Sequence, residues 1–241
     1  MDALIYTVMS GAERSMRAQQ VHANNLANAD TAGFRADLEL STAQAVDGPG
    51  FGSRHSAVLH ANAISGRQGA VRQTGRELDV AIQGDGYFAV QAPGGEAYTR
   101  SGSFVVDEQG NLTVGGRPVL GEGGPIVLPP FTRIVIGADG RIQVEAPGEP
   151  GLQEVDRLRL VSAEPASLTK SPEGLIVSRD GAPLPVDETV RVVAGHLEGS
   201  NVSAVEEMVA TMQVTRDFDI QMRMFNTADR LADAANRLVR E

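Results

Sequence analysis

The sequence predicts a mixed α and β fold, in which N- and C-terminal α-helices pair as a coiled-coil-like domain and enclose a central, mainly antiparallel β domain. All 12 prolines and 25 of the 27 glycines lie between residues 48 and 199. Because both residue types are costly inside helices and common in turns, long helices are expected only outside that range. The outer segments carry apolar residues at helical spacing, whereas the middle carries short strand-like runs between turn residues.

The N-terminal segment, residues 1–34, is expected to form one helix that ends in an asparagine-rich run. Its mainly apolar positions repeat at alternating steps of four and three residues, which is typical of a coiled-coil seam. Asparagine is a poor helix former but a good end residue, so the helix should end close to Asn28, and Gly33 should lie in a turn. The seam consists of Ile5, Met9, Ala12, Met16, Gln19, Ala23 and Leu26.

The C-terminal segment, residues 198–241, is expected to form the second helix. Ser203 and Glu206 make a capping-box pattern at its start. Arginines recur every seven residues from Arg216 to Arg237 and therefore share one face. This face is either a solvated stripe or a ladder that meets acidic residues of neighbouring subunits. The apolar stripe consists of Met224, Ala228, Leu231, Ala235 and Leu238.

The central β domain is expected over residues 76–197. Residues 35–75 show no sustained period and are expected to form an extended linker. Short strands with regular turns between them indicate a small antiparallel sandwich or barrel. The expected strands are 79–83, 87–90, 104–106, 112–114, 134–136, 141–144, 158–161, 175–177 and 190–193.

The residues of the chain offer no recognisable catalytic chemistry. There is no Cys, and the four histidines (His22, His55, His60 and His196) make no metal-ligand spacing with one another. No phosphate-binding loop, dinucleotide fingerprint or nucleophile elbow occurs. We therefore expect no catalytic residue, no cofactor, no metal and no enzyme.

The charge and hydropathy of the chain exclude two classes of partner. The formal net charge is −10, which argues against nucleic acid, because phosphate neutralisation needs a basic surface. No apolar run approaches the roughly 20 residues of a membrane span, so we expect no direct membrane insertion.

Three blocks of sequence carry a more specific pattern. Residues 22–35 read HANNLANADTAGFR, residues 74–88 read TGRELDVAIQGDGYF, and residues 197–208 read LEGSNVSAVEEM. The first closely resembles the signature N-N-L-A-N-x-x-T-x-G-[FY]-[KR] of bacterial flagellar rod and hook proteins. The second and third resemble the start of that family's β domain and of its C-terminal helix. The opening residues are similar to proximal-rod members of the flagellar basal-body rod protein family, and Ala204 is a departure, because relatives often carry Asp or Asn there.

The resemblance implies a structural subunit of the flagellar rod, which transmits torque from motor to hook across the periplasm. It implies other rod proteins and copies of this chain as partners, and export through the flagellar type III apparatus. Two alternatives remain, a distal-rod or hook-type axial protein and a secreted coiled-coil/β binding module. We expect the subunit interface at Ile5, Met9, Met16, Asn24, Asn25, Leu26, Asn28, Asn201, Met208, Met224, Leu231 and Leu238.

Overall fold

A computed structural model describes residues 2–45, 55–148 and 151–240, which divide into two compact units. The helical unit comprises residues 1–27, 37–62 and 203–241. The β unit comprises residues 28–36 and 63–202. The chain is therefore a mixed α and β protein with one long helix at each end, as the sequence predicts.

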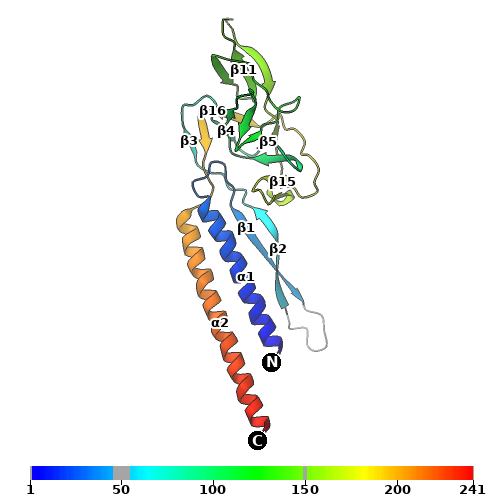
Figure 1. Ribbon diagram of the computed structural model, residues 1–241, viewed down its shortest axis with the longest axis vertical. Helices are drawn as coiled ribbons and strands as arrows, with labels where there is room; N and C mark the ends of the chain where they lie inside the picture. The colour runs from blue at the N-terminus through cyan, green and yellow to red at the C-terminus, as the bar shows by residue number, and fades with distance from the viewer. Residues whose placement is uncertain (1, 46–54, 149–150, 241) are drawn as a thin grey trace. The chain divides into compact units, whose positions relative to one another are not determined.

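The helical unit is built from α1 (Asp2–Ala27), α2 (Ala204–Arg240) and a two-stranded sheet of β1 (Asp37–Ala45) and β2 (His55–Ile64). The last two residues of β2 belong to the β unit. The two helices lie side by side, and β1 packs along α1 (Figure 1). The Ser203 hydroxyl accepts a hydrogen bond from the Glu206 amide at the start of α2. The N-cap expected at this position is therefore confirmed.

The faces that α1 and α2 bury within the chain differ from the stripes of large apolar residues. On α1 the buried side chains are Val8, Ser15, Ala18 and Asn25, which are mostly small. Gly11 on this face lies so close to the Gln221 side chain that an added Cβ would approach it to 3.0 Å. Small side chains let two helices approach closely, so the intrachain contact does not need the methionines, and these remain outside.

The β unit contains five small sheets, and every strand pairing recorded in it is antiparallel. The five-stranded sheet has the order β13 (Leu160–Val161), β5 (Tyr87–Ala92), β6 (Gly95–Thr99), β15 (Ile176–Ser178) and β14 (Leu168–Lys170). The three-stranded sheets are β10 (Arg133–Ile136), β11 (Arg141–Glu145) and β12 (Gln153–Arg157), and β7 (Val105–Val106), β8 (Leu112–Val114) and β9 (Arg117–Pro118). The two-stranded sheets are β16 (Arg191–Ala194) with β4 (Val80–Gln83), and β17 (His196–Glu198) with β3 (Val71–Gln73). A short 3-10 helix, η1 (Pro165–Ser167), precedes β14.

Strand β5 is buried on both faces and separates two apolar clusters of the β unit. Its side chains alternate, so Phe88 and Val90 join the larger cluster whereas Tyr87 and Ala89 join the smaller one. The larger cluster is mostly aliphatic and contains one aromatic pair, Phe88 and Phe104, whose rings meet edge to face at 5.2 Å. This rigid core carries the polar groups described below.

Two expectations about local structure differ from what is observed. Residues 35–75 were expected as a linker but contain β1, β2 and β3. Strand β3 pairs with β17, more than 120 residues further along the chain, and such distant pairing leaves no local period in the sequence. The turn at residues 84–86 also does not pair the strands that flank it, because β4 joins β16 whereas β5 joins β6 and β13. Neither helix, within the described segments, is long and apolar enough to cross a bilayer.

Candidate functional site

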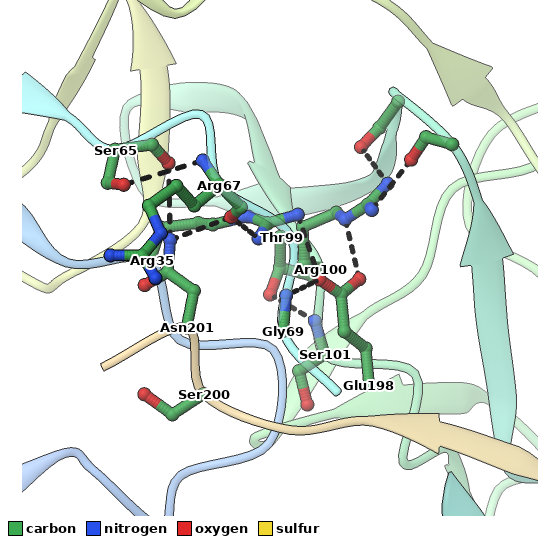
Figure 2. Close-up of polar contacts among 12 residues, drawn as sticks. Arg35, Ser65, Arg67, Gly69, Thr99, Arg100, Ser101, Glu198, Ser200 and Asn201 are labelled. Carbon is green, nitrogen blue, oxygen red and sulfur yellow. Dashed lines mark hydrogen bonds and ion pairs between the residues drawn. The ribbon is translucent and has the colours of Figure 1, made fainter. Parts of the chain in front are cut away.

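A buried charge cluster forms where three segments of the β unit meet (Figure 2). The Glu198 carboxylate pairs through Oε1 with Arg35 at 2.9 Å and through Oε2 with Arg100 at 2.8 Å. The Gly69 amide also donates to Oε1, at 2.8 Å. All three charged side chains are at most 4% exposed. Buried charges are stable only when they are paired, and this cluster pairs one carboxylate with two guanidinium groups from distant parts of the sequence. The Nε atoms of both arginines and Oε2 of Glu198 are buried in it without a hydrogen bond of their own among the described residues.

Arg100 connects the cluster to the turn between β4 and β5. Its terminal nitrogens donate to the carbonyl oxygens of Gly84 and Gly86, each at 2.8 Å, and its guanidinium lies 6.0 Å from the centre of the Tyr87 ring. Burial lowers the pKa of the Arg35 guanidinium, an effect that the Glu198 carboxylate opposes. Burial also raises the pKa of the Tyr87 hydroxyl, which the two nearby arginines oppose.

Asn201 ties the same segments together through its side-chain amide (Figure 2). Its Oδ1 accepts from the Ala36 amide at 2.7 Å. Its Nδ2 donates to the Arg67 carbonyl at 2.8 Å and to the Ser65 carbonyl at 3.4 Å. The Asn201 backbone amide donates to the Phe34 carbonyl at 3.2 Å. A single asparagine thus joins two other stretches of chain, because an amide side chain both accepts and donates.

The two residues before Arg35, Gly33 and Phe34, each meet a local structural requirement. Gly33 has a φ of +68°, and a Cβ there would lie 2.1 Å from the Ser101 nitrogen. Only glycine fits such a close approach in this backbone conformation. The Phe34 ring packs beneath the Lys170 ammonium, 3.9 Å from the ring centre, in cation–π geometry.

A second polar network lies within the helical unit and is centred on Asn25, which is 1% exposed. Its Oδ1 accepts from the Asp37 amide at 2.8 Å, and its Nδ2 donates to the Asp37 carbonyl at 3.0 Å and to Glu207 at 3.1 Å. The other Glu207 oxygen contacts the His22 ring, and Asn24 donates to the Asp37 carboxylate. This network fixes the end of α1, the start of β1 and the first turn of α2 against one another.

The face of α2 that points away from α1 is apolar and exposed. The half-buried or buried residues of α2 recur at helical spacing on one side, and include Glu207, Phe218, Gln221, Phe225 and Ala228. The exposed large apolar residues centre on the opposite side, together with the arginines at 216, 223 and 230. The exposed residues of this outer face are Val205, Met208, Val209, Met212, Ile220, Met224 and Leu231.

A cavity lies beside the charge cluster. It has a volume of about 450 Å³, and its walls include Arg35, Asp85, Tyr87, Arg100 and Glu164. Within the described segments, no group of three or more His, Asp or Glu side chains is placed to hold a metal ion.

Comparison with known proteins identifies the family. Residues 5–35 match the family model described as flagella basal body rod protein, residues 81–144 match the flagellar hook protein FlgE/F/G D1 domain, and residues 193–238 match the flagellar basal body rod FlgEFG protein C-terminal region. The flagellar basal-body rod protein FlgF of Salmonella typhimurium is 41% identical over 99% of both chains, and that of Escherichia coli is equally similar. The FlgF of Caulobacter vibrioides is 33% identical over 99% of this chain and 98% of its own.

The chain belongs to the flagellar basal-body rod protein family. It is a structural subunit of the rod and is located in the flagellar basal body, where it assembles with other rod components. The family is structural and non-enzymatic, so the chain is not an enzyme.

The predicted interface residues fall into three groups. Met9, Met16, Met208, Met224 and Leu231 are exposed in the isolated chain, with exposed fractions between 48% and 61%. Their role in subunit contact stays a prediction. Ile5 and Leu238 lie in α1 and α2, but their side chains are outside the described part of the structure.

The predicted polar residues have partners within the chain. Asn24, Asn25 and Asn201 make the bonds given above. Asn28 accepts a hydrogen bond from the Thr31 hydroxyl at 3.1 Å. The remaining predicted residue, the apolar Leu26, is half-buried. Asn25 bonds to the backbone of Asp37 at the start of β1, and contact of these asparagines across subunits stays a prediction.

Sequence reasoning missed the charge cluster. Arg35 and Glu198 lie inside the rod-family blocks, which was the signal that could have singled them out. Arg100 carries no local signal, because its environment is created only by folding.

Proposed function

We propose that this rod subunit assembles through the exposed faces of α1 and α2. The two helices pack in coiled-coil fashion with each other, and their exposed faces pack on the helices of neighbouring subunits. The helical unit is then the core-forming part of the subunit, and the β unit is a separate domain. We further propose a proximal position in the rod, transmission of torque from motor to hook, and export through the flagellar type III apparatus. The proposed position, the torque transmission and the export rest on the resemblance to proximal-rod proteins and on the FlgF relatives.

One observation carries the assembly proposal. Met9 and Met16 on α1 and the outer face of α2 leave large apolar side chains in water although each helix already packs within its own chain. Large apolar side chains that stay exposed on both helices of one chain indicate an interaction site, although arginines lie among them on α2. Burying a Leu or Met side chain contributes about 1.5–3 kcal/mol, so a few such residues per subunit supply a substantial drive for association.

The test replaces Leu231, which is 60% exposed, with Asp. An exposed side chain contributes little to the fold of the isolated chain, so the thermal unfolding of the Leu231→Asp variant should match that of the wild type. Burying a carboxylate in an apolar subunit contact is costly, so the variant should be depleted from purified basal bodies by at least an order of magnitude. The assay is an immunoblot of basal bodies from a deletion strain that expresses each variant.

Val127 supplies the matched control, because it is 54% exposed and belongs to the β unit. Val127→Asp introduces the same charge outside the helical faces and should enter basal bodies and restore swimming. Incorporation of Leu231→Asp at the wild-type level would reject the assembly proposal.

A further inference from the structure

The chain passes between its two units four times, after residues 27, 36, 62 and 202. The β-unit ends of three of these passages are bonded to one another. We call residues 33–36, 65–69 and 198–201 the root of the connecting segments. Ala36 is the last residue before one passage, Ser65 follows the next passage closely, and Asn201 comes just before the last.

Hydrogen bonds join the three stretches of the root directly. The Ser65 amide donates to the Ala36 carbonyl at 2.9 Å, and the Ala36 amide donates to Asn201 Oδ1 at 2.7 Å. Asn201 Nδ2 closes the arrangement by donating to the Arg67 and Ser65 carbonyls. Each stretch is therefore bonded to both of the others, and none can change its backbone angles without breaking bonds to its neighbours.

The root is also anchored in the core of the β unit. Glu198 receives the guanidinium groups of Arg35, from within the root, and Arg100, from the body of the β unit. The Gly33 amide donates to the Glu198 carbonyl at 2.8 Å. Hinges form where a few residues can absorb large φ and ψ changes, and backbone that is hydrogen-bonded between three stretches of chain resists such changes. The connections thus leave the β unit from a stiff base.

We propose that the root is a torsionally stiff joint. Asn201 is the positioning residue that makes the three connecting segments move together. A twisting load therefore enters the β unit through all three segments at once. The functional half of this inference rests on the proposed role in torque transmission. Three independent hinges would let the β unit swivel, whereas a joint of bonded segments shares the load.

The first test measures amide hydrogen exchange in the purified full chain. Asn201→Ala removes the bonds that join the segments, so the exchange of the Ala36 and Ser65 amides should rise together, by roughly tenfold. Ser200→Ala is the matched control, because the Ser200 hydroxyl accepts only from Val202 in its own segment among the recorded bonds. The Ala89 amide, which donates to the Arg159 carbonyl inside the β unit, reports global unfolding and should not change.

Asn201→Asp separates a joint from a single lost bond and replaces the alanine variant if that chain does not fold. Aspartate still accepts from the Ala36 amide but cannot donate to the Arg67 and Ser65 carbonyls. If the root acts as one joint, the Ser65 amide should exchange faster in this variant, even though the bond from the Ala36 amide to the side chain at position 201 is kept. Unchanged exchange at Ser65 in the aspartate variant, or faster exchange at Ala36 alone in the alanine variant, would overturn the joint.

The second test measures swimming as the viscosity of the medium is raised, in a deletion strain that carries each variant. The Asn201→Ala strain should lose motility at a lower viscosity than the wild-type and Ser200→Ala strains. Equal motility at every viscosity, together with faster exchange at Ala36 and Ser65, would show a joint that carries no load and would overturn the inference. Absence of the wild-type chain from basal bodies would instead overturn the proposed function.

Discussion

Replacing Glu198 with Gln tests whether the buried charge cluster is energetically required. Glutamine keeps the shape of the side chain and can still accept from the Gly69 amide, but it leaves two buried guanidinium groups without a counter-charge. Removing one partner of a buried ion pair costs about 3–5 kcal/mol. In a unit of about 150 residues, each kcal/mol lowers the melting temperature by roughly 2–4 °C. We therefore expect the melting temperature of the β unit to fall by roughly 6–20 °C in differential scanning calorimetry.

The exposed pair of Arg117 and Glu173 provides the control for that experiment. Its atoms are 3.0 Å apart, a distance close to those in the cluster, but its side chains are 30% and 46% exposed. Exposed pairs contribute about 0–1 kcal/mol, so Glu173→Gln should change the melting temperature by roughly 4 °C or less. If Glu198→Gln melted within roughly 4 °C of the wild type as well, the reasoning from burial and pairing would be refuted.

Three further perturbations follow from the described contacts. Gly33→Ala should lower the free energy of unfolding in urea far more than Gly75→Ala does, because both glycines have positive φ but only Gly33 lacks room for a Cβ. Equal losses of free energy in the two variants would exclude the steric cause. Asn25→Leu removes two hydrogen bonds to the Asp37 backbone and one to the Glu207 carboxylate and should lower the free energy of unfolding by roughly 2 kcal/mol or more, and a loss below about 0.5 kcal/mol would contradict the described network. Burial raises the pKa of Tyr98 from 10.0 to about 12, so the stability that this tyrosine contributes is present below pH 10 and is lost as the pH rises toward 12. A phenolate absorbance titration should show both Tyr87 and Tyr98 ionising late, and Tyr98→Phe should remove one of the two late steps; two late steps in that variant would refute the assignment.

The two terminal helices could be predicted because their signals are local. The proline-free, glycine-poor ends, the asparagine run and the Ser203 cap are all visible in short windows, and α1 ends at Ala27 while α2 begins at Ala204. Which face each helix buries could not be predicted. The intrachain face of α1 uses small residues such as Ser15 and Ala18, whereas a search for large apolar residues selects Met9 and Met16, which are exposed.

The strands and the charge cluster show a similar division. The strands of two hairpins, β10 with β11 and β7 with β8, were expected close to their observed positions, with turns between them. Strand β17 and the Glu198 cluster depend on partners far away in the sequence, so no local pattern reveals them. Their residues could be singled out only through the rod-family blocks, and even these do not say that Arg100 completes the cluster.

The most direct test of the assembly account is to ask whether the exposed helical faces become covered in the rod. The chain has no Cys, so Met16→Cys and Met224→Cys each introduce a single thiol on an exposed position of α1 or α2. Maleimide labelling of the purified chain should be rapid for both variants. In intact basal bodies the same thiols should be protected, and they should label fully once the basal bodies are dissociated. Equal labelling of free and assembled chains would contradict the claim that these faces hold the rod together.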